Sequence, residues 1–125
     1  VIDLYTAFYM RDAQLENWRY ALAGPHGAEN RARLADVDVY KVGHHGSLNA
    51  TPQRLLWANF RKRGATAGAR MLSLLSTKKS NHGSTASRTE VPRATLKAAL
   101  AEQTDLHDTE GYPASTLVVP ITIPL

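Results

Sequence analysis

Apolar and polar positions alternate along this chain in short stretches, some with the two-residue period of a strand and others with the spacing of a helix. Residues 1–10, VIDLYTAFYM, are rich in β-branched and aromatic side chains and predict a strand. Residues 37–43, VDVYKVG, and residues 71–76, MLSLLS, predict two more, the first apolar enough to be buried on both faces of a parallel sheet. A last strand is expected at 116–123, where Pro120 suits an edge position.

Helical spacing occupies the stretches between the strands. In residues 12–24, apolar side chains recur at intervals of three and four, with Asp12 available as N-cap and Gly24 at the end of the pattern. Thr51 and Pro52 suit the first positions of a second helix. The apolar side of that helix would consist of Leu55, Leu56, Trp57 and Phe60.

A third helix is expected after Thr89, which can cap it, with Pro92 in the first turn and Leu96 and Leu100 four residues apart. Residues 24–33, GPHGAENRAR, combine glycines, a proline and charges without an apolar period, and this pattern predicts a loop. The resulting alternation of strands and helices predicts an α/β fold, a layered sheet with flanking helices.

The amino-acid composition narrows the possible classes of protein. A length of 125 residues fits a single domain, 1–125, and the absence of an initiator Met leads us to expect a piece of a longer product. The chain has no cysteine, which excludes disulfides and thiolate metal sites, and a formal charge of +4 permits an anionic partner without requiring one. No apolar run is long enough to cross a membrane and no signal peptide is evident, so we expect a cytoplasmic protein without a membrane partner.

Two adjacent histidines follow the second predicted strand, in the stretch VYKVGHHGSLNATP at residues 39–52. Residues just past the carboxyl end of a strand lie where open α/β sheets bind their ligands, and neutral imidazole is a common metal ligand. His44 and His45 are therefore candidate ligands, and Ser47 can donate to a phosphate. The alternative is a polar loop in which the histidines form local hydrogen bonds and Ser47 serves the turn or caps the next helix.

This stretch closely resembles the LKVPHHGS signature of metallo-β-lactamase-fold hydrolases of the kind found at the C-terminus of competence DNA-uptake channel proteins. It is also similar to a YKVGHHGSHNAT stretch of larger stand-alone bacterial members. Upstream, RDAQLENW at residues 11–18 resembles a GDAQ…NW segment of the family in the same order and separation, with Arg11 in place of the usual glycine. The resemblance spans about residues 12–110 and implies the C-terminal half of an αββα sandwich.

The resemblance also implies a chemistry, the hydrolysis of phosphodiester or related ester bonds with a divalent metal, Zn or Mn, in the complete protein. Asp12 corresponds to the metal-bridging aspartate, although it would serve equally well as an N-cap. His44 or His45 would bind metal or stabilise the developing oxyanion, and His82 in SNHGS is a further candidate ligand.

Ser47 and Asn49 of the same motif are the candidate substrate-binding residues, and His26 and His107 are expected on the surface. The family's main ligands come from an HxHxDH loop in the N-terminal half, and this chain has no HxH sequence. We therefore expect the missing half of the fold, or a second copy in a homodimer, to complete the structure.

Two other classes of function remain possible. A truncated or degenerate relative could serve as a non-catalytic interaction module. A nucleic-acid-binding module is the other possibility, supported by basic residues near possible phosphate contacts, namely Arg61, Lys62, Arg63, Lys78, Lys79 and Arg88.

Overall fold

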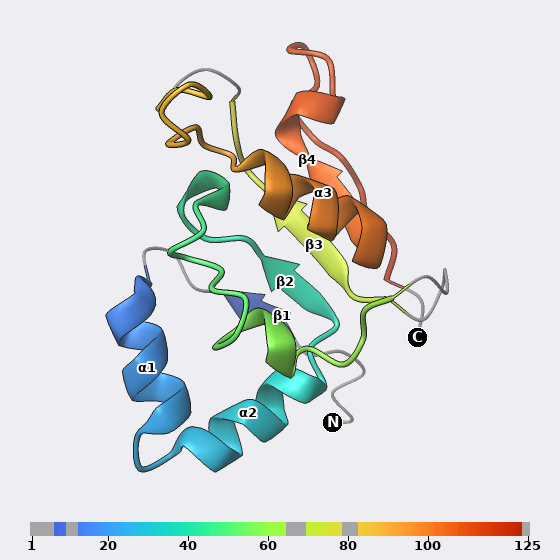
Figure 1. Cartoon of the computed structure of the whole chain (residues 1–125). Helices are drawn as coiled ribbons and strands as arrows, with labels where there is room; N and C mark the ends of the chain where they lie inside the picture. The colour runs from blue at the N-terminus through green and yellow to red at the C-terminus, as the bar shows by residue number, and fades with distance from the viewer. Residues whose placement is uncertain (1–6, 10–12, 65–69, 79–82, 124–125) are drawn as a thin grey trace.

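The computed structural model describes residues 7–9, 13–64, 70–78 and 83–123, and these form a parallel sheet with helices (Figure 1). The strands are β1 (Ala7–Tyr9), β2 (Val39–Lys41), β3 (Leu72–Leu75) and β4 (Asp105–Asp108). They lie in the order β1-β2-β3-β4, and every neighbouring pair is parallel. The predicted α/β class is confirmed.

The described α-helices are α1 (Leu15–Ala23), α2 (Gly27–Ala35) and α3 (Ala94–Gln103). Single 3₁₀ turns occur at η1 (His44–Gly46), η2 (Trp57–Asn59) and η3 (Thr109–Gly111). Figure 1 shows α3 lying over β3 and β4, whereas α1 and α2 lie beyond the β1 end of the sheet, with the η2 turn between α2 and the strands.

The strand register separates the two faces of the sheet. Tyr40 is paired with Ser73, and Ser73 with Leu106, so these three side chains share one face. Tyr40 belongs to a single buried cluster with apolar residues of the helices and of the η2 turn, namely Trp18, Leu22, Leu34, Leu56, Trp57, Phe60, Leu96 and Leu100. In the described chain, the helices therefore cover this face.

The opposite face carries Lys41, Leu74 and His107, which are neighbours across β2, β3 and β4. These three side chains are half-buried, and they line a groove together with residues of the C-terminal segment, residues 112–121. The sheet is thus covered by helices on one face and by extended chain over part of the other.

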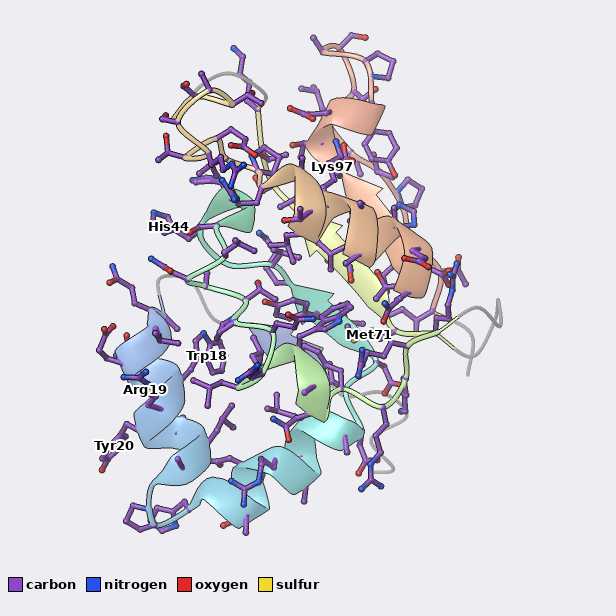
Figure 2. All side chains as sticks on the ribbon, viewed as in Figure 1. Trp18, Arg19, Tyr20, His44, Met71 and Lys97 are labelled. Carbon is purple, nitrogen blue, oxygen red and sulfur yellow. The ribbon has the colours of Figure 1, made fainter. Side chains whose placement is uncertain are left out.

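The buried face is held by aromatic residues. Trp18 is 1% exposed, points into the core in Figure 2 and donates its indole N–H to the carbonyl oxygen of Ala50 at 3.0 Å. The Tyr40 ring lies 4.9 Å from that of Phe60, and its hydroxyl is hydrogen-bonded to the Thr51 hydroxyl at 2.8 Å. These polar contacts satisfy groups that burial would otherwise leave without a partner.

The prediction of a loop at residues 24–33 is wrong, because α2 occupies most of it. The helix is polar on its outer side, where Arg33 and Glu29 form an ion pair at 2.6 Å. It buries Gly27 at its start and Leu34 and Ala35 near its end. The side chain of Asn30 donates to the carbonyl oxygen of Ala21 at 2.7 Å. So few buried apolar side chains leave no helical repeat of apolar residues in the sequence. Contacts with α1, rather than an amphipathic pattern, therefore stabilise α2.

The predicted α-helix after Thr51 is also wrong. Backbone hydrogen bonds there run from Leu56 to Pro52, from Ala58 to Gln53 and from Phe60 to Trp57, so the spacing changes from four to five to three residues. An α-helix requires a constant spacing of four, and only the η2 turn forms. The expected apolar side is nevertheless correct, since Leu56, Trp57 and Phe60 are buried.

The strand expected at 116–123 does not form, because the fourth position of the sheet belongs to β4, which directly follows α3. Residues 116–123 make no ladder in the described chain, and Leu117 and Val118 are 94% and 81% exposed. Strand composition alone was misleading there, since a strand exists only where a partner edge accepts its hydrogen bonds.

Two helix starts also differ from the expectation. The N-cap of α1 is Gln14, whose N–H donates to the Asn17 side chain at 3.0 Å, rather than Asp12. The N-cap of α3 is Arg93 rather than Thr89, so Pro92 lies before the helix. Gly24 ends α1 as predicted, with its N–H donating to the carbonyl oxygen of Tyr20 at 3.0 Å.

Strand expectations at residues 37–43 and 71–76 are confirmed by β2 and β3, and within 1–10 the described strand is β1. In the described parts of the chain, no helix is both long enough and apolar enough to cross a membrane.

Burial of Tyr40 makes the fold sensitive to alkali. Burial raises the pKa of Tyr40 from 10.0 to about 12, so between pH 10 and pH 12 the unfolded chain releases the phenolic proton and the folded chain retains it. Stability should therefore fall as the pH rises through this window, by about 1.4 kcal/mol per unit of pKa difference and roughly 2 to 3 kcal/mol in total. Urea unfolding at successive pH values, compared with Tyr40→Phe, measures this contribution. Parallel stability curves for the two proteins would contradict it.

Candidate functional site

The two adjacent histidines lie in a tight left-handed turn beyond β2, at the edge of the sheet where the strands have their carboxyl ends. The φ angles are +44° at His44, +52° at His45 and +87° at Gly46. Only the last of these residues adopts such a conformation without cost, and a left-handed backbone costs other residues about 1–2 kcal/mol each. Strained backbone that the surrounding structure maintains is typical of functional sites.

Gly46 is the point at which this turn is fixed to the rest of the fold. It is buried, and a Cβ atom there would lie 2.8 Å from the Cβ of Pro92 and 3.3 Å from a methyl carbon of Leu75. Its carbonyl oxygen accepts the N–H of Arg93 at 3.0 Å. The turn is therefore held between the end of β3 and the start of α3, where only glycine fits.

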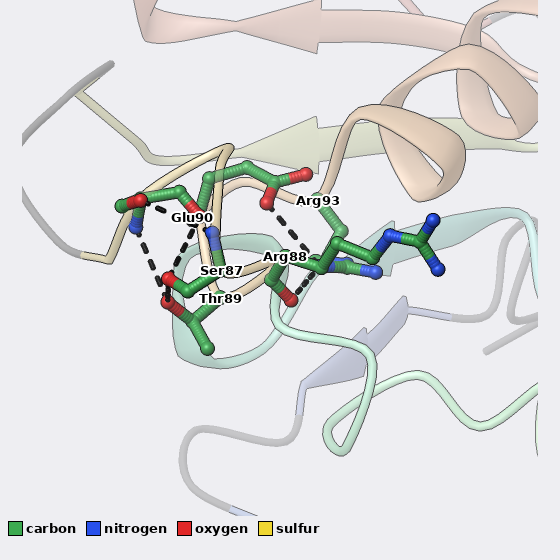
Figure 3. Close-up of polar contacts among 6 residues, drawn as sticks. Ser87, Arg88, Thr89, Glu90 and Arg93 are labelled. Atoms are coloured by element: carbon green, nitrogen blue, oxygen red, sulfur yellow. Dashed lines mark hydrogen bonds and ion pairs between the residues drawn. The ribbon is translucent and has the colours of Figure 1, made fainter.

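The segment before α3 is itself braced by polar contacts (Figure 3). The Ser87 hydroxyl is hydrogen-bonded to the Thr89 hydroxyl at 2.9 Å, and Arg93 forms an ion pair with Glu90 at 3.2 Å. Arg93 also donates to the carbonyl oxygen of Arg88. These contacts fix the segment that presses on Gly46.

His45 has a defined ring orientation. Its Nδ1 atom lies 2.9 Å from the carbonyl oxygen of Ser76, just beyond β3. A carbonyl can only accept, so Nδ1 carries the proton and donates it, which leaves the lone pair of the neutral ring on Nε2. This is the arrangement in which protein histidines bind metals through Nε2.

His44 is exposed, and Figure 2 shows its side chain directed outward from the turn. Its carbonyl oxygen accepts the N–H of Ser47 at 3.0 Å, and the Ser47 carbonyl accepts the N–H of Ala50 at 3.2 Å. Ser47 therefore has the turn role that was one of its two interpretations. Asn49 is exposed in the next turn.

The structure places two of the four predicted metal ligands, His44 and His45, in one turn. Asp12 and His82 lie outside the described residues, so their positions relative to His44 and His45 stay predictions. Among the described residues, no three His, Cys, Asp or Glu side chains are grouped closely enough to hold a metal ion. A catalytic zinc takes about three protein ligands, and the histidine turn provides two imidazoles.

Other polar groups at this sheet edge escaped the sequence analysis. Lys97 of α3 lies 3.1 Å from Asp108 and 2.8 Å from Glu110, and the hydrogen bond with Glu110 is the main cause that raises the pKa of Lys97. His107, expected on the surface, is half-buried, and its Nδ1 lies 2.6 Å from the Tyr112 hydroxyl. Of these groups, His107 and Asp108 come from β4, a strand that the sequence pattern did not show.

The basic residues considered for nucleic-acid binding include two with internal contacts. Lys62 pairs with Asp38 at 2.5 Å, and Arg63 donates to the carbonyl oxygen of Phe60 at 2.7 Å. The Arg63 guanidinium also lies 5.4 Å from the centre of the Trp57 ring. These contacts hold two of the six cations against the fold, Lys79 lies outside the described residues, and nucleic-acid binding stays a prediction.

Comparison with protein-family models, with curated proteins and with solved structures finds no match to this chain.

The strained turn makes a testable prediction about stability. His44→Gly should be more stable than His44→Ala by about 1 kcal/mol, because glycine relieves the left-handed strain that alanine keeps. The matched control is Ala28→Gly on the exposed side of α2, where glycine should instead cost about 1 kcal/mol. Chemical denaturation of the three variants measures both differences. An alanine variant at residue 44 as stable as the glycine variant would show that the turn is not left-handed.

Proposed function

We propose that this chain is the C-terminal portion of a metal-dependent hydrolase of the metallo-β-lactamase superfamily that acts on phosphodiester or related ester bonds. The observation that carries the proposal is the pair of histidines in a strained, firmly anchored turn at the carboxyl edge of a parallel sheet. Two successive non-glycine residues at positive φ are uncommon, although histidine adopts this conformation more often than most residues do.

In this proposal, His45 is a metal ligand through Nε2, and the Ser76 carbonyl fixes its orientation by accepting the proton on Nδ1. The exposed His44 is a second ligand or a donor to a developing oxyanion. Asp12 and His82 are the further candidate ligands. When bound, a divalent metal such as Zn or Mn would lower the pKa of a water molecule and polarise the ester.

Ser47 and Asn49 are proposed to bind substrate next to the histidine turn. Ser47 is half-buried and held within the turn, whereas Asn49 is exposed beside it. Both can donate to phosphate oxygens, and donors fixed by the backbone lose little freedom when they bind an anion.

The described residues hold fewer ligands than a catalytic centre requires, so the proposal includes a second part: the remaining ligands come from elsewhere. They would be supplied by the missing half of the fold or by a second copy. That half would also cover the sheet face opposite the helices, as the inner faces of two sheets cover each other in a sandwich.

Metal binding by the isolated chain should accordingly be weak. Titration calorimetry with Zn²⁺ should show binding well below the roughly 10–16 kcal/mol of structural zinc sites. The double variant His44→Asn, His45→Asn should lose it, because asparagine tolerates the left-handed backbone but lacks the imidazole. His26→Asn, at an exposed position before α2, is the matched control and should bind as the unaltered chain does. Identical isotherms for the double variant and the unaltered chain would refute the assignment.

The same reasoning predicts that the isolated chain does not hydrolyse phosphodiesters at an appreciable rate, because two imidazoles do not assemble a complete metal site. Release of nitrophenol from bis(p-nitrophenyl) phosphate, with and without Zn²⁺ or Mn²⁺, provides the measurement. Robust turnover that a chelator abolishes, from the 125-residue chain alone, would show that its own residues complete the centre.

Assembly is the third consequence. In the absence of the other half, we expect two copies to pair through the sheet faces that the helices leave uncovered, in a two-fold contact. Sedimentation equilibrium at micromolar concentration should give about twice the chain mass of 13.7 kDa. A stable species of 13.7 kDa that persists at high concentration would contradict this pairing.

A further inference from the structure

A second site lies on the face of the sheet that the helices do not cover. A groove of about 440 Å³ separates β2, β3 and β4 from the C-terminal segment and is lined on the sheet side by Lys41, Leu74 and His107. Its other wall includes Val119 and Ile121. This volume is in the range of sites for small organic ligands.

Lys41 is the unusual residue of this groove. It lies on β2, in the interior of the sheet, and its side chain is half-buried. Its ammonium group donates to the carbonyl oxygen of Val42 at 3.1 Å, and within the described chain no carboxylate pairs with it. Burial lowers the pKa of Lys41, which shows that the charged form is poorly solvated. An anion bound in the groove would supply the missing opposite charge.

The floor and the far wall of the groove are mainly apolar or neutral. Leu74 lies between Lys41 and His107 across the strands, which separates the backbones of those two residues by about 10 Å. The His107 ring is stacked on Tyr112 at 6.4 Å between centroids and hydrogen-bonded to its hydroxyl. Asp108 also lines the groove, and Lys97 of α3 pairs with it at 3.1 Å while also pairing with Glu110 at 2.8 Å.

From this arrangement we propose that the groove binds a small organic anion with an apolar body, of the class of aryl phosphates and aryl carboxylates. The Lys41 ammonium holds the anionic group, and the body of the ligand lies over Leu74 between the stacked His107 and Tyr112 rings and the C-terminal segment. The site adjoins the histidine turn through Ser76, which lines the groove and anchors His45. Binding there requires no metal, but the groove lies on the sheet face that the proposed other half or second copy would cover, so the ligand and that partner compete for the same face.

The experiment is a titration of the ¹⁵N-labelled chain with phenyl phosphate, followed by ¹H–¹⁵N correlation spectra in metal-free buffer. Saturable shifts are expected at Lys41, Leu74, His107 and Val119. Phenol, which lacks the charge, and inorganic phosphate, which lacks the body, should each bind at least tenfold more weakly.

Single variants distinguish the effect of the Lys41 charge on binding from an effect on the stability of the fold. Lys41→Met should weaken the binding of phenyl phosphate at least tenfold and should melt at the same temperature as the unaltered chain or higher, because it removes a poorly solvated charge. Arg19→Met, on the exposed side of α1, removes the same charge far from the groove and should leave the binding unchanged. Leu117→Asp changes a residue of the C-terminal segment that lines the groove and is 94% exposed, and it leaves the sheet unaltered. This variant should also weaken the binding of phenyl phosphate.

Several outcomes would overturn the proposal. The first is Lys41→Met binding within twofold of the unaltered chain, and the second is inorganic phosphate binding as tightly as phenyl phosphate. The third is a set of shifts centred on residues 44–47 or on surface arginines instead of the groove.

Discussion

The architecture depends on one constraint, the handedness of crossovers between parallel strands. A right-handed crossover places its connecting segment on a fixed side of the sheet, and the order β1-β2-β3-β4 repeats the same step three times. In the described chain, the helices of these connections therefore pack on one face. This explains why Tyr40 and the helix residues share one core, whereas Lys41, one position along the same strand, faces away from it. It also brings the carboxyl ends of the strands to a common edge, where the histidine turn, the Ser76 carbonyl and the groove lie together.

The backbone conformation of the histidine turn costs free energy. Two non-glycine residues stay at positive φ because Gly46 is held between Leu75 and Pro92 and because Arg93 donates to its carbonyl oxygen. The start of α3 thus holds a turn that begins at the end of β2, more than forty positions earlier in the chain. Lys41 shows a related cost, since a half-buried ammonium group without an opposite charge is less well solvated than an exposed one. Both costs lie at the same sheet edge, and function is the simplest reason to keep them.

The sequence predicted the parts of the fold that depend on local pattern. β2 and β3 are short apolar runs between turn residues, and the spacing of Trp18 and Leu22 identified α1. The failures share a different cause, dependence on distant partners. Contacts with α1 stabilise α2, β4 exists because β3 offers an edge to a half-polar segment, and residues 116–123 have strand composition without a ladder. For the site, the motif located His44, His45 and Ser47, but no local signal could show that Ser76 orients His45 or that Lys41 and His107 share a groove.

Side chains on the two faces of the sheet should have different neighbouring residues, and nuclear Overhauser effects measure this directly. The His107 ring should show cross-peaks to the Leu74 methyl groups and to Val119 or Ile121, while Leu106, one position earlier, should show them to Leu96 and Leu100 of α3. Cross-peaks from the His107 ring to Leu96 and Leu100 would contradict the account. They would place the ring under α3, and neither the groove nor the one-sided arrangement of helices would then exist.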